Sequence, residues 1–522
     1  MLPILSGESE SPSVDRHAKL YELRQQVTTL VTDCRYVDAI HLIEQRLPKL
    51  YLMPHGFGDL VANPSHDVRN GYRAQADHVT LLDSLFCETR THQLEVLRQM
   101  SIETPDYRAG INLLTLKLLE AGAAREALEL ARSCFESKQN CVYSEAVLGE
   151  TLRKVCEEGI PEDLKLSDVE ESLLEDFSQF YCPKAFTNFE VFRTGEVFVC
   201  CGSLLPASIG NVYDSDFKSI WNSDAAQKIR ASIHDGSFRY CSRTCTNIRT
   251  KNLPLKRDVE ALPQELYRSS RISNNKLLVL QDGPKTVNLA HDYTCNLSCP
   301  SCRRGMKSAD SKRREALDQV FERGISPLLA HTRDLQIAGD GDPFASKHYR
   351  QILSALSVEK YPTLKLRLLT NGVLFDENEW NNFANIHPLL ADISISIDAA
   401  TPETYELVRR GGDWARLMNN LEFLGERRRE GKFPVLSLNF VVQQRNFREM
   451  AAFVELGKRF NADRIFFQPV HNQTESFTQT EFRDADILNP SHPDYTAFQE
   501  SLYHPLLSDP VVRIGFPRPT DH

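Results

Sequence analysis

The chain has 522 residues, a net charge of −10, 41% hydrophobic residues and 25% charged residues. A chain of this length is too long for a single hydrophobic core, so two or three domains are expected. The composition is that of a soluble globular protein. The negative net charge disfavours a nucleic acid partner, because proteins that bind nucleic acid usually carry a basic domain or surface. With no signal-peptide pattern and no run of 18 apolar residues, we expect a cytoplasmic protein without a membrane partner.

Residues 1–165 predict an all-α domain. Apolar residues recur at three- and four-residue spacing over Leu20–Leu47 and Ile111–Val155. The segment Ala121–Ala131 has the pattern of a helix turn followed by a packed second helix. No repeat period accompanies this pattern, so a plain helical domain is a better interpretation than an α-helical repeat.

The 13 cysteines are unevenly distributed. In a cytosolic protein, cysteines more often bind metal or act in catalysis than form disulfides. Five lie in helical sequence and are expected as small core residues: Cys34, Cys87, Cys134, Cys141 and Cys156. The other eight form two groups: Cys182, Cys200, Cys201, Cys241 and Cys245, then Cys295, Cys299 and Cys302.

Residues 166–262 predict a small, cysteine-rich α+β domain. A β-hairpin around Arg193–Glu196, with glycine at its turn, would bring Cys182 and Cys200 together. Cys241 and Cys245 follow as a C-x3-C pair. Four thiolates would complete either a zinc site or an iron–sulfur cluster. Cys201, beside Cys200, is an alternative ligand.

Residues 263–283 are expected as a linker, 284–475 as a barrel domain and 476–522 as a C-terminal extension. Over the barrel domain, strand and helix patterns alternate, which predicts a parallel sheet with its site at the carboxyl ends of the strands. The strand candidates are Thr286–Ala290, Asp334–Ala338, Leu364–Leu369, Ile393–Ile397, Val435–Val442 and Arg464–Gln468. The helix candidates are Arg313–Arg323, Tyr349–Leu356, Trp414–Arg428 and Phe447–Arg459.

Cys295 directly follows the first of these strands and begins a C-x3-C-x2-C motif with Cys299 and Cys302. Three thiolates can hold three irons of a cubane [4Fe-4S] cluster and leave the fourth iron open to a substrate or cofactor. Zinc is the alternative, but zinc sites usually take four ligands in paired C-x2-C spacing.

This motif resembles the signature of the radical S-adenosylmethionine (SAM) superfamily, which follows the first strand of a partial (β/α)6 barrel. The resemblance implies a [4Fe-4S] cluster whose open iron is chelated by the amino and carboxylate groups of SAM. It also implies reductive cleavage of SAM to a 5′-deoxyadenosyl radical that abstracts hydrogen from a C–H bond. The electron donor would be a protein such as flavodoxin or ferredoxin.

The later strand ends match this family in order, and the resemblance implies cofactor contacts there. The segment Ala338–Phe344 stands where the family has a Gly-Gly-Glu-Pro-like sequence, and Asp342 aligns with its acidic position. The implied cofactor-binding residues are Gly339, Asp340, Asp342, Asn371, Ser394, Ser396 and Asp398. The last three could instead be satisfied core polar groups or helix caps. Many members have an aromatic residue before the third cysteine; Ser301 stands here, so Tyr293 or Phe466 is expected beside the adenine.

The upstream cysteines are similar to those of SPASM/twitch domains in their order C-x12-G-x4-C, gap, C-x3-C. This resemblance implies a second, auxiliary [4Fe-4S] cluster on Cys182, Cys200, Cys241 and Cys245. The order of the domains departs from the family, because the auxiliary domain usually follows the barrel and here precedes it.

The resemblance implies a radical SAM oxidoreductase or maturase. We expect it to cross-link, oxidise or epimerise a peptide, with the helical domain as a surface for a leader segment. The alternative is dehydrogenation or rearrangement of a small molecule such as a sugar or amino-sugar. A third hypothesis, of another class, is a non-catalytic metal-binding scaffold, although the ordered strand ends favour chemistry.

Overall fold

The structure is a computed structural model that describes residues 90–103, 108–136, 142–159, 165–193, 195–206, 208–471 and 477–518. The chain divides into two compact units that alternate along the sequence. The helical unit holds the described residues up to Phe186, together with Phe198–Gly210 and Trp221–Gln281. The sheet unit holds Thr187–Val197, Asn211–Ile220 and the described residues from Asp282 onwards.

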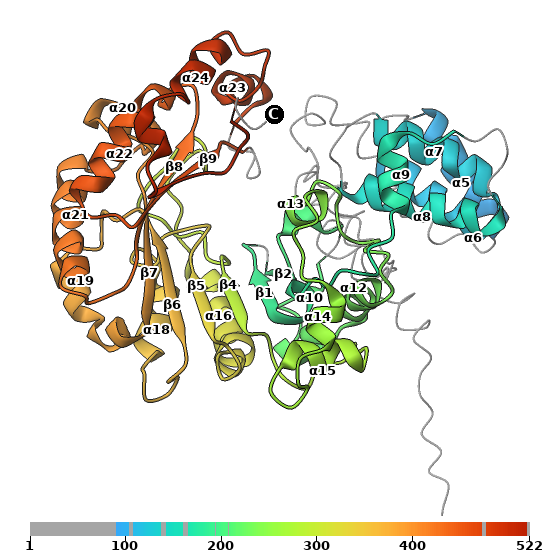
Figure 1. Cartoon of the computed structure of the whole chain (residues 1–522), viewed down its shortest axis with the longest axis horizontal. Helices are drawn as coiled ribbons and strands as arrows, with labels where there is room; N and C mark the ends of the chain where they lie inside the picture. The colour runs from blue at the N-terminus through green and yellow to red at the C-terminus, as the bar shows by residue number, and fades with distance from the viewer. Residues whose placement is uncertain are drawn as a thin grey trace, which may run out of the picture. The chain divides into compact units, whose positions relative to one another are not determined.

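The helical unit begins with a set of packed helices (Figure 1). These are α5 (Arg90–Glu103), α6 (Arg108–Glu120), α7 (Ala124–Glu136), α8 (Val142–Glu158) and α9 (Asp168–Leu174). The helices expected over Ile111–Val155 are therefore confirmed, and Gly122 makes the turn between α6 and α7 with φ of +79°. Small and branched apolar side chains, including Leu128, Ala131 and Leu152, fill the core. The predicted helix over Leu20–Leu47 lies outside the described residues.

Short helices make up the rest of the helical unit. They are α10 (Lys184–Thr187), which ends at the border with the sheet unit, η3 (Gly202–Leu204), α12 (Asp224–His234), α13 (Thr246–Arg249), α14 (Lys256–Glu260) and α15 (Arg268–Asn274). Helix α11 (Phe217–Trp221) belongs to the sheet unit except for its last residue. The segment expected as a linker contains α15, in which Ile272 is buried. Arg230 of α12 is fully buried and donates to the carbonyl oxygens of Ala185, Trp221 and Leu278. These hydrogen bonds tie the segment after α15 into the unit.

The sheet unit is built on a sheet of strand order β10-β9-β8-β7-β6-β5-β4-β1-β2-β3. The six predicted strands are confirmed and pair in parallel: β4 (Thr286–Leu289), β5 (Asp334–Ile337), β6 (Lys365–Thr370), β7 (Leu390–Ser396), β8 (Leu436–Val442) and β9 (Arg464–Pro469). Fully buried residues alternate with half-buried or exposed ones along β4, β5 and β6. This alternation places one face of those strands against a helical layer.

Four strands outside the predicted barrel domain extend this sheet. They are β1 (Asn188–Val191), β2 (Glu196–Phe198), β3 (Gly210–Asn211) and β10 (Val512–Ile514). β1 pairs in parallel with β4, and β10 pairs in parallel with β9. The expected hairpin at Arg193–Glu196 is present between β1 and β2. Gly195 has φ of +82°, and a Cβ there would lie 2.3 Å from the ring of Tyr213.

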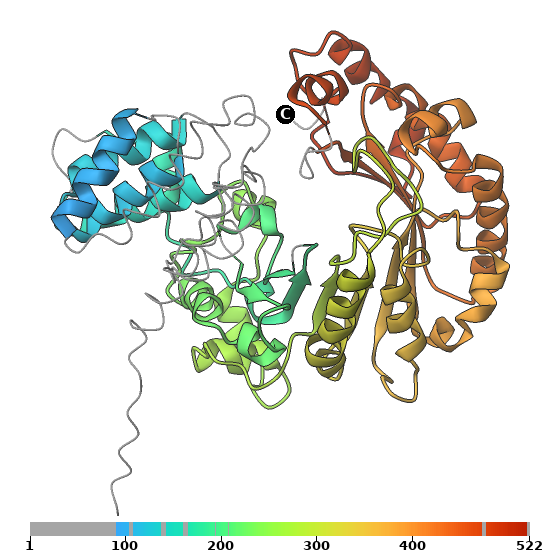
Figure 2. The same ribbon diagram turned by 180° about the vertical axis from the view of Figure 1, so that it is seen from behind.

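Helices connect the parallel strands and cover the outer face of the curved sheet, as both views show (Figures 1 and 2). They are α16 (Ser311–Val320), η4 (Phe321–Ile325), α17 (Ser326–Leu329), α18 (Lys347–Ala355), α19 (Glu377–Asn382), η5 (Ala384–Leu389), α20 (Pro402–Val408), α21 (Trp414–Arg429), η6 (Phe447–Glu449) and α22 (Met450–Arg459). After β9 come α23 (Gln479–Ala485), α24 (Tyr495–Ser501) and η7 (Pro505–Ser508). Among the residues that the structure describes, no helix combines the length and apolar character needed to cross a membrane.

Candidate iron–sulfur and cofactor site

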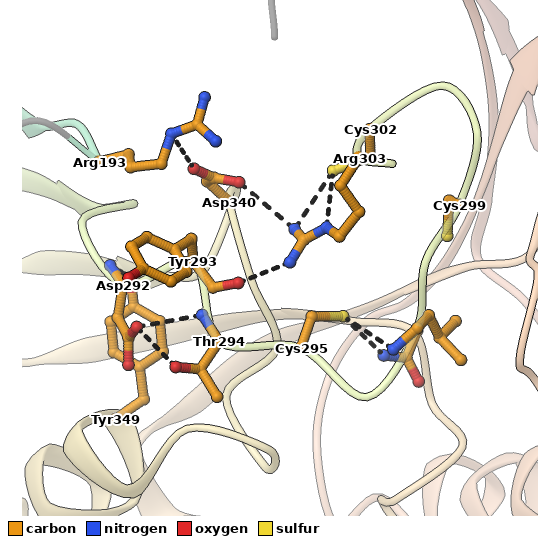
Figure 3. Close-up of polar contacts among 12 residues, drawn as sticks. Arg193, Asp292, Tyr293, Thr294, Cys295, Cys299, Cys302, Arg303, Asp340 and Tyr349 are labelled. Atoms are coloured by element: carbon orange, nitrogen blue, oxygen red, sulfur yellow. Dashed lines mark hydrogen bonds and ion pairs between the residues drawn. The ribbon is translucent and has the colours of Figure 1, made fainter. Parts of the chain in front are cut away.

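The three cysteines of the downstream motif lie on one loop that follows β4 (Figure 3). Asp292 shapes the start of this loop, because one carboxylate oxygen accepts from the backbone N–H and the hydroxyl of Thr294, at 3.0 and 2.8 Å. Further on, the N–H groups of Cys302 and Arg303 both donate to the Cys299 carbonyl. The loop is therefore a folded structure with defined cysteine positions.

Each of the three sulfurs accepts an N–H group. Cys295 Sγ accepts from the Leu297 backbone at 3.5 Å and from Asn371 Nδ2 at 3.7 Å. Cys302 Sγ accepts from Nη2 and Nε of Arg303, at 3.2 and 3.4 Å (Figure 3). Cys299 Sγ accepts from Arg409 Nη1 at 3.8 Å. N–H groups that donate to ligand sulfurs orient the ligands and tune the potential of a cluster, so the donor set fits an iron–sulfur cluster.

Burial keeps the thiols of Cys295 and Cys299 protonated in the absence of metal. It raises the pKa of Cys295 to about 11 and also raises the pKa of Cys299. A thiolate is the form that binds iron, so loading the site releases protons. In the described part of the chain, no three His, Cys, Asp or Glu side chains converge as ligands of one metal ion. In a cubane cluster, by contrast, each thiolate binds its own iron.

Asp342 lies at the carboxyl end of β5 and is fully buried. Its carboxylate accepts from Thr370 Oγ1 at 2.6 Å, from the Asn371 N–H at 2.9 Å and from the Phe344 N–H at 3.0 Å. These bonds join the loop after β5 to the end of β6. Burial raises the pKa of Asp342, and the hydrogen bonds act against that rise.

The neighbouring residues of this loop approach the cysteine loop closely. Gly341 has φ of +134°, and a Cβ there would lie 2.2 Å from the Asp292 carbonyl oxygen. Asp340 pairs with Arg303 and with Arg193, at 3.4 and 3.1 Å (Figure 3). Gly339 packs closely against Ala290, because an added Cβ would lie 3.2 Å from the Ala290 side chain.

Asn371 is a predicted cofactor-binding residue that contacts a cysteine sulfur directly. Besides donating to Cys295 Sγ, its Nδ2 donates to Asn296 Oδ1 at 2.9 Å, and its Oδ1 accepts from the Val373 N–H. The end of β6 is thereby joined to the cysteine loop.

The predicted residues of β7 fall into two environments. Ser394 and Ser396 are half-buried and alternate with buried isoleucines, and Ser394 donates to Asp392. Asp398 lies beyond the end of β7, is almost fully buried and has φ of +62°. One oxygen of Asp398 pairs with Arg409 Nη2 at 2.7 Å and the other accepts from the Val441 N–H at 2.7 Å. Through Arg409, Asp398 is linked to Cys299.

The four upstream cysteines all belong to the helical unit. Burial raises the pKa of Cys182 and raises that of Cys241 well above its usual value. Cys182, Cys200 and Cys245 lie close enough to Cys241 to raise its pKa further. Cys201 is exposed, whereas Cys200 is half-buried.

A buried glutamate of α8 holds the loop between Cys241 and Cys245. Glu145 accepts from the Arg243 N–H at 2.6 Å and from Ser242 Oγ at 2.8 Å. Burial raises the pKa of Glu145, and these hydrogen bonds act against that rise. The cysteine spacing gives no indication of this residue. An acidic residue at an otherwise apolar helix position was its only signal.

Comparison with family models identifies two segments of the chain. Residues 291–457 match the radical SAM superfamily, and residues 182–246 match the SPASM iron–sulfur cluster-binding domain. Both matches include the cysteines considered above, and their order along the chain is the predicted one.

Comparison with individual proteins gives distant similarities. The chain is 21% identical over 183 residues to the probable GTP 3′,8-cyclase of Methanocaldococcus jannaschii, which covers 34% of this chain. The match spans about half, 56%, of that relative's length. Among solved structures, SuiB of Streptococcus suis is similar with a TM-score of 0.33 and 13% identity, over 47% of this chain and 51% of SuiB. The structure of TYW1 with a lysine–pyruvate adduct bound is similar with a TM-score of 0.26 and 17% identity, over 36% of this chain and 64% of TYW1.

Proposed function

Since the chain carries a radical SAM domain preceded by a SPASM domain, we propose that Cys295, Cys299 and Cys302 hold the SAM-binding [4Fe-4S] cluster of a radical enzyme. The observation that carries this proposal is the single loop after β4 on which all three sulfurs accept N–H groups. When bound, the cluster supplies the electron that cleaves SAM to a 5′-deoxyadenosyl radical, which abstracts hydrogen from a substrate C–H bond. An electron donor of the flavodoxin or ferredoxin class would reduce it.

The polar residues at the strand ends would position the cofactor. Asn371 and Asp340 lie beside the cysteine loop, and Gly339 is the second residue after the end of β5. Ser394 and Ser396 are half-buried on β7. Asp342 and Asp398 are paired with groups of the chain itself, so they would act by orienting Thr370, Asn371 and Arg409.

We propose the upstream cysteines Cys182, Cys200, Cys241 and Cys245 as ligands of one auxiliary [4Fe-4S] cluster. The SPASM match and the proximity of these thiols support it. The exposure of Cys201 favours Cys200 as the ligand from this pair. Four thiolates would complete the cluster, which suits electron transfer or a structural role.

A peptide is the proposed substrate, to be cross-linked, oxidised or epimerised. The SPASM match supports it, because the resembling domains are common in peptide maturases, where an auxiliary cluster can accept the electron left after hydrogen abstraction. A small molecule is the second candidate. The similarity to a probable GTP 3′,8-cyclase favours that alternative.

The radical chemistry is tested with protein reconstituted anaerobically and incubated with dithionite and SAM. We expect 5′-deoxyadenosine and methionine, measured by chromatography, and their loss in Cys299→Ala. Cys156→Ala is the control, because Cys156 belongs to neither cysteine group. Wild-type protein that holds its irons yet yields no 5′-deoxyadenosine would contradict the proposal.

The substrate class is tested by adding a small precursor peptide encoded beside the gene, with GTP in a parallel reaction. A mass change of the peptide, with deuterium transfer from labelled peptide into 5′-deoxyadenosine, supports the peptide proposal. Consumption of GTP with no change in the peptide supports the second candidate instead.

A further inference from the structure

A buried arginine lies directly against one of the proposed cluster ligands. Arg303 is 5% exposed and points Nη2 and Nε at Cys302 Sγ, at 3.2 and 3.4 Å. Its Nη1 donates to the carbonyl oxygen of Tyr293 at 2.5 Å. The guanidinium therefore uses one edge for the sulfur and another for the backbone (Figure 3).

A chain of charges holds this guanidinium in place. One oxygen of Asp340 lies 3.4 Å from Arg303 Nη2, and the other lies 3.1 Å from Arg193 Nε (Figure 3). Burying a guanidinium is costly without a charged partner, and Asp340 is that partner.

Arg193 comes from the segment that matches the SPASM domain. It stands at the end of β1, on the hairpin that the sheet unit includes. Arg313 fixes the hairpin there, because its Nη2 donates to the carbonyl oxygens of Arg193 and His291, at 2.8 and 3.0 Å. The SPASM-matched segment thus contributes a charged residue beside the downstream cysteine loop.

We propose that Arg303 is a positioning residue that raises the reduction potential of the downstream cluster, and that Asp340 and Arg193 hold it in that role. The inference rests on the proposed function, since it takes Cys302 as a cluster ligand. Hydrogen bonds to ligand sulfurs and nearby positive charge stabilise the reduced cluster, which carries one more negative charge. Removing the Arg303 cation therefore makes the cluster harder to reduce.

The test compares Arg303→Gln with the control variant Arg304→Gln. Arg304 is the next residue in the chain, and its side chain is 66% exposed. The potential is measured by anaerobic redox titration followed by electron paramagnetic resonance. The signal that changes on adding SAM identifies this cluster rather than the auxiliary one. We expect the ratio of reduced to oxidised cluster at a fixed solution potential to fall about tenfold in Arg303→Gln, a shift of about 59 mV for one electron. Arg304→Gln should match the wild type.

Two further variants keep the test decisive if Arg303→Gln does not hold its irons. Arg303→Lys keeps the charge without the paired N–H groups and should give an intermediate potential. Arg193→Gln should shift the potential in the same direction by a smaller amount. The inference is overturned if Arg303→Gln with its full iron content keeps the wild-type potential. It is also overturned if Arg303→Lys and Arg193→Gln both keep that potential. Either result leaves the proposed function intact. Absence of a SAM-responsive signal in the wild type overturns the proposed function itself.

Discussion

Two pairs of adjacent arginines show what sequence can say about single residues. Arg303 and Arg409 each donate to a cysteine sulfur, whereas Arg304 and Arg410, beside them, are exposed. The C-x3-C-x2-C spacing is enough to predict the cysteines, because ligand spacing is a local property. It says nothing of which arginine in each pair is turned inward, since this depends on Asp340 and Asp398 from other strand ends.

A buried histidine pair near the start of the cysteine loop makes a residue-scale prediction about acid stability. His291 Nε2 and His348 Nε2 lie 2.8 Å apart, so one ring donates and the other accepts. Burial lowers the pKa of His348 from 6.5 to about 4. The folded protein therefore keeps this histidine neutral, while the unfolded chain gains a proton below pH 6.5. Stability is complete above pH 6.5 and falls as the pH drops towards 4, by up to about 3 kcal/mol.

Urea unfolding at pH 7 and pH 5, under anaerobic conditions, measures this effect. His348→Gln removes the titrating group and should lose less unfolding free energy between the two pH values than the wild type. Equal losses in both proteins would show that another group is responsible.

Gly341 makes a second residue-scale prediction. In Gly341→Ala, the added Cβ meets the carbonyl oxygens of Asp292 and Thr294, at 2.2 and 2.9 Å, and the backbone keeps a positive φ. We expect a cost of about 1–3 kcal/mol in unfolding free energy and poorer iron loading. Gly305→Ala is the control, because an added Cβ there meets nothing within 4 Å. Equal iron contents in the two variants would contradict the prediction.

At the scale of elements, regular alternation made six strands predictable, while the edges of the sheet were not. β1 and β10 are short strands that lie outside the segment in which strand and helix patterns alternate regularly. Their partners are also distant in sequence, as the pairing of Asn188 with Thr286 shows. Position 188 lies in the segment expected as the auxiliary domain, so only tertiary pairing reveals that it is part of the sheet.

Helix α8 makes the element-scale prediction, because its Glu145 holds the loop between Cys241 and Cys245. Glu145→Gln replaces one acceptor oxygen with an amino group facing a donor, which costs about 1–3 kcal/mol. We expect loss of auxiliary iron while SAM cleavage is retained. Glu157→Gln is the control on the same helix, because Glu157 is exposed and pairs only with Lys154 in the contacts that the structure describes. Unchanged iron content in Glu145→Gln would show that the loop holds without this carboxylate.

At the scale of the whole molecule, the two proposed ligand sets lie in different compact units. Losing one set should therefore spare the cluster held by the other. We expect roughly eight irons per chain in the wild type, and roughly four in either Cys299→Ala or the double variant Cys241→Ala/Cys245→Ala. Only the double variant should still cleave SAM. Loss of all iron in either variant would show that the two sites depend on each other.

The chain crosses between the two units repeatedly, entering the sheet unit at Thr187, leaving after Val197, returning for Asn211–Ile220 and staying from Asp282. The SPASM-matched segment, residues 182–246, therefore contributes to both units and is not a separate domain. A gene that lacked the codons before residue 282 would yield a sheet without β1, β2 and β3, and a cysteine loop without Arg193. Recombination that exchanged the SPASM segment between relatives would need to preserve the hairpin as well. Because the chain alternates between the two units, we expect the SPASM-matched and radical SAM-matched segments to be inherited together, although each matches its own family model.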